Sequence, residues 1–221
     1  MNHSTHFKAT YNGQSYDFKT QHQHFKLQIK DAQSQKITID IAVISGEQLV
    51  TYRDPDIGNT EYYDTIGLFI EHLQIPCSFI KEKNFRSLQE VNINYQQDWA
   101  LDPHPMLTPT SDIIGVITSQ LRPSGDYITS LKAHFKHLSH GLFLISLEGT
   151  TDAKDHEAIS DFSLKFPANL EIEVWDVESN SDLRDLFTRY FHEQDFEISI
   201  LLSDAGIQQI LTATVKDSIT Q

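Results

Sequence analysis

The chain has 221 residues, with 31 acidic side chains against 17 basic ones and a formal net charge of −14. This length supports one large domain or two small ones with a real core. Nucleic-acid binding depends on Lys and Arg that neutralise phosphates, and no cluster of them stands in the sequence, so direct contact with DNA or RNA is not expected. The charge indicates a well-solvated surface, with a basic partner or DNA mimicry as the alternatives.

Three features bear on the location of the protein. No run approaches the ~18 apolar residues of a membrane helix, and the first ten residues, MNHSTHFKAT, lack the apolar segment of a secretory signal. Cys77 is the only cysteine, which excludes an intramolecular disulfide and a cysteine-based zinc site. We therefore expect a cytoplasmic protein with no membrane span.

The first 54 residues are predicted to be a β-meander. Asn12-Gly13 separates two alternating segments and suits a two-residue hairpin turn. Apolar and polar residues then alternate over 25–29 and over 37–43, as in half-exposed strands. The residues Ser45 to Gln48 are predicted to turn the chain into a return strand over 49–53.

Helices are expected after residue 59. The apolar residues of the segment 60–73 cover one side of a helix that Thr60 can cap. A short strand over 77–80 and the start of another helix over 84–91 follow. The proline-rich segment 96–110 is predicted to be a linker or a long crossing loop, with one domain over 1–95 and a second over 111–221.

The second half is predicted to alternate strands and helices. Ile128, Leu131, Phe135 and Leu138 lie three or four residues apart, which indicates a helix over 126–140. Further elements are expected at these positions: a helix or strand over 111–121, strands over 142–149, 170–177 and 196–202, and helices over 157–163, 182–191 and 203–211. The predicted fold class is therefore mixed α/β, with an N-terminal β-meander plus helices and a C-terminal alternating β-α layer.

The segment 37–56, ITIDIAVISGEQLVTYRDPD, is the first candidate site. Asp40 points to the face opposite its apolar neighbours in the strand. The order strand, turn, strand, helix, strand, helix over 37–90 resembles the nuclease core of the PD-(D/E)XK superfamily, the restriction-endonuclease-like fold, and within it the TnsA-type transposon endonucleases. The resemblance implies Asp40 and Asp54 as ligands of Mg²⁺, and Asp40, Asp54 and Asp56 as the catalytic acids.

The segment departs from the family pattern at the catalytic lysine. Tyr52-Arg53-Asp54-Pro55-Asp56 stands where the family carries an acid-x-Lys motif. Arginine is almost always charged and is a poor general base. Three alternatives stay open: an ordinary hairpin, a nuclease fold that has lost its chemistry, and an active Mg²⁺-dependent nuclease.

Two other groups of side chains have metal-binding chemistry. Glu171 and Glu173 share one face of a predicted strand and could hold Mg²⁺. His134, His137 and His140 are spaced by three, as some zinc ligands on a helix are. A strand with one polar face and a solvated helix flank are the simpler interpretations, so no metal site is predicted at either.

The expected function is that of a non-catalytic accessory or interaction protein that acts through a protein partner. The predicted helix 182–191 carries Leu183, Phe187, Tyr190 and Phe191 on more than one side and is expected to be the partner-binding surface. A mobile-element or defence setting follows from the resemblance by analogy. No cofactor is expected; the alternative is a nuclease of the restriction-endonuclease-like superfamily that uses Mg²⁺.

Overall fold

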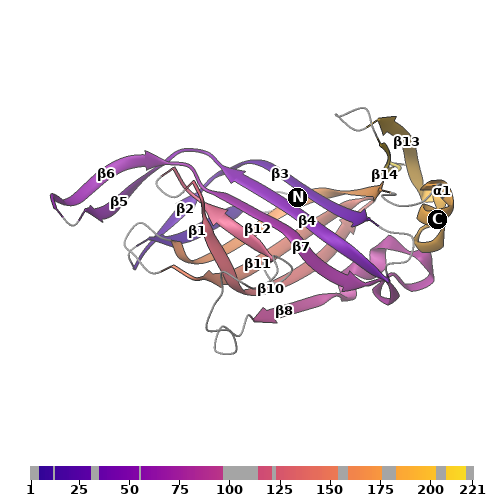
Figure 1. Ribbon diagram of the computed structural model, residues 1–221, viewed down its shortest axis with the longest axis horizontal. Coiled ribbons are helices and arrows are strands. Elements are labelled where there is room, and N and C mark those ends of the chain that lie inside the picture. The colour runs from indigo at the N-terminus through magenta and orange to yellow at the C-terminus, as the bar shows by residue number, and fades with distance from the viewer. Residues whose placement is uncertain are drawn as a thin grey trace.

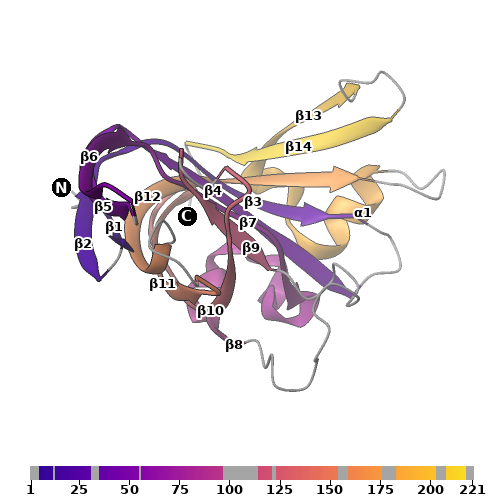
Figure 2. The ribbon, with the colours of Figure 1, turned by 60° about the vertical axis from the view of Figure 1, so that its left-hand side comes forward.

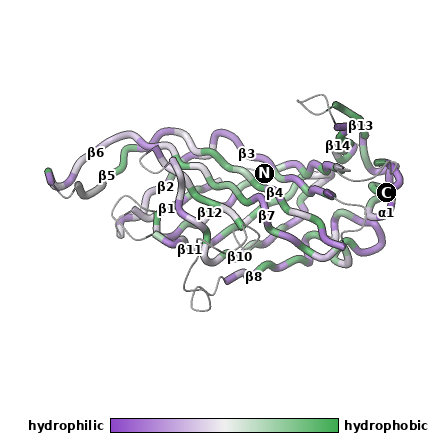
Figure 3. Tube along the Cα trace, viewed as in Figure 1, coloured by the Kyte–Doolittle hydropathy of each residue, from purple (hydrophilic) through white to green (hydrophobic). Residues whose placement is uncertain are grey.

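The structure is a computed structural model that describes residues 5–11, 13–30, 35–54, 56–96, 114–120, 123–153, 159–175, 183–202 and 208–217. Strands dominate it (Figure 1). They form one 12-stranded sheet and a separate two-stranded sheet. Apolar and polar residues alternate along many of the strands (Figure 3), because successive side chains of a strand point to opposite faces.

Seven strands of the large sheet close into a barrel, in the order β11-β10-β9-β7-β4-β3-β12, with β11 pairing back onto β12. Their bounds are β3 (Thr20–Ile29), β4 (Lys36–Ser45), β7 (Gly67–Pro76), β9 (Gly115–Thr118), β10 (Asp126–Ser139), β11 (Leu142–Thr151) and β12 (Ile159–Trp175). Neighbours are antiparallel except β3 and β12. Strands from both sides of the segment 97–113 share this barrel, and the predicted boundary at 96–110 lies almost wholly outside the described residues.

The remaining strands of the large sheet extend it beyond the barrel. They are β1 (His6–Tyr11), β2 (Gln14–Phe18), β8 (Asn92–Gln96), β13 (Phe196–Leu202) and β14 (Gln209–Val215). β1 pairs with the first half of β12 and carries β2, and β8 pairs with β10. β14 pairs with the end of β12 and carries β13, so that these two strands project from the barrel (Figure 2).

The second sheet is a hairpin of β5 (Gln48–Asp54) and β6 (Gly58–Asp64) that protrudes at one end of the molecule (Figure 1). The helical elements lie at the other end. They are the helix α1 (Leu183–Tyr190) and the 3₁₀ turns η1 (Cys77–Phe79), η2 (Lys81–Lys83), η3 (Phe85–Glu90) and η6 (Glu193–Asp195).

The predicted α/β class is wrong, because most of the expected helices are strands. The segment 60–73 forms most of β6 and the first part of β7, and 126–140 forms β10. The expected helix over 157–163 falls on the start of β12, and the one over 203–211 on β14 and undescribed residues. Among the described residues, the nuclease-like α/β core that the resemblance implies is therefore not found, while the helix predicted over 182–191 is confirmed as α1.

β-Bulges explain the two largest errors. In β10 the register moves from Ile128↔Thr151 to Ser130↔Thr150, so the strand gains one residue there. Buried side chains shift from Ile128 to Leu131 and Phe135, which reproduces helical spacing on a strand. A bulge in β7 moves the buried side chains from Ile70 to Leu73, which gives helical spacing at the end of the segment 60–73.

The segment 37–56, the first candidate site, is not one hairpin. β4 pairs with β3 and β7, whereas β5 pairs with β6. The residues Ser45 to Gln48 therefore lead the chain out of the barrel instead of folding β5 back onto β4. The predicted strand over 77–80 is also corrected, because η1 occupies it.

Candidate functional site

The structure brings together acids that the sequence placed in separate candidate sites. β3 lies between β4 and β12, and its register pairs Lys26 with both Asp40 and Glu171. Gln28 of β3 stands beside Glu173 of β12 in the same way. These side chains point away from the barrel interior, on the face opposite the buried core residues of β3.

Glu173 is the centre of this polar cluster, and its side chain is only 11% exposed. Lys26 Nζ donates to Glu173 Oε1 at 2.6 Å and lies 3.9 Å from Glu171 Oε2. Glu173 Oε2 accepts hydrogen bonds from Gln28 Nε2 at 3.1 Å and from Trp175 Nε1 at 3.3 Å. Both oxygens of this carboxylate are therefore satisfied by donors of the chain itself.

Asp40 is joined to the same cluster through a shared donor. Gln28 Nε2 lies 3.0 Å from Asp40 Oδ2 and also donates to Glu173. His24 Nε2 lies 3.0 Å from Asp40 Oδ1. We call the set formed by His24, Lys26, Gln28, Asp40, Glu171, Glu173 and Trp175 the Glu173 cluster.

The electrostatics of the cluster favour a charged Lys26. Burial by itself lowers the pKa of Lys26. The hydrogen bond and charge of Glu173, with the charges of Glu171 and Asp40, outweigh burial and raise that pKa above its ordinary value. The ammonium group thus occupies the place between the carboxylates, and no group of three or more His, Cys, Asp or Glu among the described residues could hold a metal ion.

The three predicted catalytic acids do not meet. Asp40 lies in the barrel wall, whereas Asp54 pairs with Gly58 at the tip of the β5–β6 hairpin. Asp56 is exposed in the turn of that hairpin, which extends away from the barrel (Figure 1). The side chain of Asp54 lies outside the described ones. The pair predicted to bind Mg²⁺, Asp40 and Asp54, is therefore separated by the length of the hairpin.

The predicted partner surface on α1 is largely core. Leu183, Phe187 and Phe191 are buried, and Tyr190 is half-buried. The ring centroid of Phe187 lies 5.4 Å from that of Phe191 and 5.3 Å from that of Phe196 on β13. These rings pack between the helix and the sheet, so the aromatic area that suggested a sticky surface is already covered within the chain.

The exposed apolar surface lies instead on β13, which sequence reasoning missed. Ile200, Leu201 and Leu202 are consecutive and are 47%, 55% and 65% exposed. Within the described part of the chain, β13 pairs only with β14, so its other edge is free. The signal was visible in the sequence FEISILL, where the run Ile-Leu-Leu breaks the alternation expected of a half-buried strand.

The buried carboxylate of Asp64, at the end of β6, joins the base of the β5–β6 hairpin to β1 and to the residue that follows the barrel strand β9 by two positions. Tyr11 Oη donates to Asp64 Oδ2 at 2.8 Å, and Asp64 Oδ1 accepts from the backbone N–H groups of Thr65 and Gln120, each at 2.8 Å. Burial, followed by the charge and hydrogen bond of Asp64, raises the pKa of Tyr11. Both side chains are fully buried, which marks them as structural groups.

The three predicted histidines lie on or beside β10 rather than on a helix. His134 Nδ1 lies 3.0 Å from Asn92 Oδ1, and His137 Nε2 lies 2.6 Å from the carbonyl oxygen of His140. The His137 ring also packs edge-on against Phe143, with centroids 5.2 Å apart. These contacts account for the rings of His134 and His137 without a metal.

Comparison with known proteins adds no family. No family model matches the chain, and neither a curated protein nor a solved structure matches it. No comparison bears on the likeness of residues 37–90 to the restriction-endonuclease-like superfamily, and the order of elements that suggested it differs from the order in the structure. In the described part of the chain, no helix is both long and apolar enough to cross a membrane.

Proposed function

We propose that the protein is a non-catalytic interaction protein that binds a protein partner along the free edge of β13. The observation that carries this proposal is the run Ile200, Leu201 and Leu202, exposed on a strand with one unpaired edge. Exposed apolar side chains scattered singly need no explanation, but a contiguous group at a sheet edge is typical of an interaction site.

An unpaired strand edge offers backbone N–H and C=O groups to another strand. Proteins usually protect such an edge with lysine, proline or a bulge. The sequence of β13, FEISILL, contains neither lysine nor proline, and its pairing with β14 runs without a bulge from Phe196 to Leu202. The edge is therefore regular and open to addition of a strand.

The charge of the chain favours a basic partner over a second copy. Two copies would bring together two chains of formal charge −14 each. Glu193 and Glu197 are exposed and Asp195 is half-buried near the start of β13. An extended segment with alternating apolar residues and a Lys or Arg facing Glu197 would match both the apolar end and the acidic end of the strand.

A cytoplasmic setting belongs to this proposal. It rests on the single cysteine, Cys77, since secreted domains of modest size often depend on disulfides.

The proposal is tested by selecting ten-residue peptides from a random display library on the purified protein. We expect the selected peptides to combine alternating Ile, Val or Leu with Lys or Arg. The double variant Ile200→Lys, Leu202→Lys should lose their binding, because it places charge on the apolar face of the edge. Leu49→Lys, which alters an exposed apolar side chain of β5, is the matched control.

Backbone pairing is tested separately by hydrogen exchange. A bound peptide should slow the exchange of β13 amides, and methylation of its backbone nitrogens should abolish binding. Peptides that bind the double variant as well as the wild type would overturn the proposal. If the wild type dimerised with rising concentration and the double variant alone did not, the partner of β13 would be a second copy of the chain and not a basic segment.

A further inference from the structure

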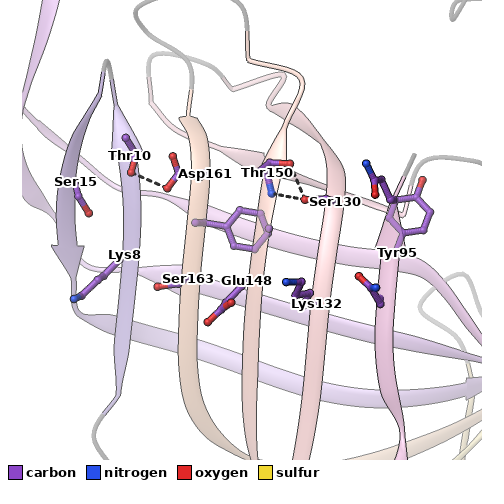
Figure 4. A pocket seen from close by; sticks show the side chains of 14 residues that line it. Lys8, Thr10, Ser15, Tyr95, Ser130, Lys132, Glu148, Thr150, Asp161 and Ser163 are labelled. Atoms are coloured by element: carbon purple, nitrogen blue, oxygen red, sulfur yellow. Dashed lines mark hydrogen bonds between the residues drawn. The ribbon is translucent and has the colours of Figure 1, made fainter. Parts of the chain in front are cut away.

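A polar hollow of about 530 Å³ lies on the outer face of the barrel (Figure 4). Its walls come from β10, β11 and β12, flanked by β1 and β2 on one side and by β8 on the other. The outward side chains that line it are almost all polar: Lys8, Thr10, Ser15, Asn94, Gln96, Ser130, Lys132, Glu148, Thr150, Asp161 and Ser163. We call this site the polar groove.

Strand register arranges these side chains in rows across the sheet. One row runs through Lys8, Ser163, Glu148, Lys132 and Asn94, each paired with the next. Neighbouring positions are about 4.8 Å apart, the spacing of paired strands. A second row holds hydroxyl, carboxylate and amide groups in the same way: Ser15, Thr10, Asp161, Thr150, Ser130 and Gln96. Hydrogen-bonded strands fix these positions before any ligand arrives.

Many polar side chains of the groove have no partner within the described chain, which leaves them available to a ligand. Seven of the polar side chains make no hydrogen bond or ion pair with any residue that the structure describes: Lys8, Ser15, Asn94, Gln96, Lys132, Glu148 and Ser163. Glu148 and Lys132 even face each other across β10 and β11 without forming an ion pair. The groove therefore presents free donors and free acceptors side by side.

The rest of the second row is held in place by internal bonds. Thr10 Oγ1 donates to Asp161 Oδ1 at 2.9 Å, and Ser160 Oγ donates to Asp161 Oδ2 at 2.9 Å. The hydroxyl groups of Ser130 and Thr150 are 2.7 Å apart. These contacts hold the middle of the second row in place, while the side chains of the first row remain available to a ligand.

The groove continues into a second hollow of about 410 Å³. The two share Asn94, Lys132 and Glu148. The second hollow adds Asn92, His134 and Ser146. These three residues are paired across β8, β10 and β11 and form a third polar row beside the first. A ligand with several repeating units could therefore extend from one hollow into the other.

We infer that the polar groove binds a carbohydrate without net charge. A sugar hydroxyl both donates and accepts, so it needs mixed partners, and the groove supplies ammonium and amide donors beside carboxylate and hydroxyl acceptors. Two lysines and two acids line it, Lys8 and Lys132 against Glu148 and Asp161, so their charges balance. This site lies on strands other than β13 and goes beyond the proposed function.

Other classes of ligand fit the groove less well. An apolar molecule would bury the free polar groups without replacing their bonds to water, which costs free energy. A polyanion meets Glu148 and Asp161 in the site and a chain of formal charge −14 around it. A neutral polyol avoids both costs.

The test is binding of neutral oligosaccharides, followed by NMR chemical-shift changes and calorimetry. The panel contains maltohexaose, cellohexaose, chitohexaose and mannohexaose, with a hyaluronan fragment, inorganic phosphate and an anionic naphthalene dye as other classes. We expect at least one neutral oligosaccharide to shift amides of β8, β10 and β11. Lys132→Met and Glu148→Gln should each weaken this binding about tenfold.

Lys136→Met is the matched control, because Lys136 is exposed on the same face of β10 but lines neither hollow. It should bind as the wild type does. The inference is overturned if no neutral oligosaccharide binds, if binding survives in both groove variants, or if only the hyaluronan fragment, phosphate or dye binds. Unchanged thermal unfolding of the variants distinguishes a lost ligand contact from a lost fold.

Discussion

Two polar regions on the outer wall of the same barrel differ in how their side chains are satisfied. In the Glu173 cluster, carboxylates are paired with Lys26, Gln28 and Trp175 at hydrogen-bond distance. In the polar groove, Glu148 and Lys132 are neighbours in register, yet their side chains make no hydrogen bond or ion pair with any residue that the structure describes. Both regions contain lysines and carboxylates, but only in the Glu173 cluster does the lysine form an ion pair with a carboxylate.

This difference indicates that the charges of the Glu173 cluster stabilise the fold, whereas those of the polar groove are available for binding. A buried carboxylate without a donor is costly, so the donors around Glu173 contribute to the stability of the fold. A solvated side chain without a partner contributes little to stability but can exchange water for a ligand. Substitutions in the two regions should therefore act on different measurements.

The largest effect is expected for Lys26→Met. Removing the ammonium group leaves Glu173 without its countercharge, and Glu173 is 11% exposed. The free energy of unfolding should fall by about 1–3 kcal/mol, measured by urea denaturation. The double variant Lys26→Met, Glu173→Leu should recover part of the loss, since no charge is then left alone. Equal losses in the single and double variants would contradict a paired cluster.

A smaller loss is expected for Gln28→Leu. Its side-chain amide lies 3.1 Å from Glu173 and 3.0 Å from Asp40, so the change removes donors from two carboxylates at once. The free energy of unfolding should fall by about 1–2 kcal/mol. Gln74→Leu is the control and should change stability little, because Gln74 is exposed on β7, which pairs with the other edge of β4. If the Gln28 variant were as stable as the control, the hydrogen bonds from Gln28 to Glu173 and Asp40 would contribute nothing to stability.

The pH dependence should separate the regions further. The folded state raises the pKa of Lys26 above the ordinary value of 10.5, so the stability from its pairing is fully present below pH 10.5 and is lost as pH rises through the folded-state pKa. The difference in unfolding free energy between the wild type and Lys26→Met should therefore shrink above pH 10.5. A constant difference across that range would disagree with the pairing. Tyr11 is present in both proteins, so its contribution to the pH dependence cancels in this difference.

The smallest effect is expected in the polar groove. Glu148→Gln and Lys132→Met each remove a charged group that makes no hydrogen bond or ion pair with a described residue. Each should therefore change the free energy of unfolding by less than about 0.5 kcal/mol. Thermal and urea unfolding measure this. A loss as large as that of Lys26→Met would mean that the groove, too, is held together by its charges, and the contrast between the two regions would fail.

Local pattern was enough to determine several elements of this protein. The first predicted hairpin is confirmed, because Tyr11 pairs with Gln14 and Gly13 has a φ of 76°, a conformation that glycine adopts freely. The strands around 25–29, 37–43, 142–149 and 196–202 and the helix α1 are confirmed as well. In the strands 25–29 and 37–43, apolar and polar residues alternate without interruption, so the period of two reports the buried face directly.

The tertiary structure decided what local pattern could not. The extra residues at the bulges of β7 and β10 are accommodated only because a neighbouring strand pairs around them, and their phase shift resembles a helix when the sequence is read alone. Whether β5 pairs with β4 or β6, and whether Phe187 faces a partner or Phe196, depend on contacts between distant segments.

The candidate sites follow the same division. The sequence identifies Asp40, Glu171 and Glu173 as carboxylates on strands, since alternation assigns each to a polar face. It cannot show that Lys26 and Gln28 stand between them, because the parallel pairing of β3 with β12 joins residues about 145 positions apart. Sequence spacing fixes the face of a side chain, while its neighbours across the sheet are set by which distant strands the closed barrel brings together.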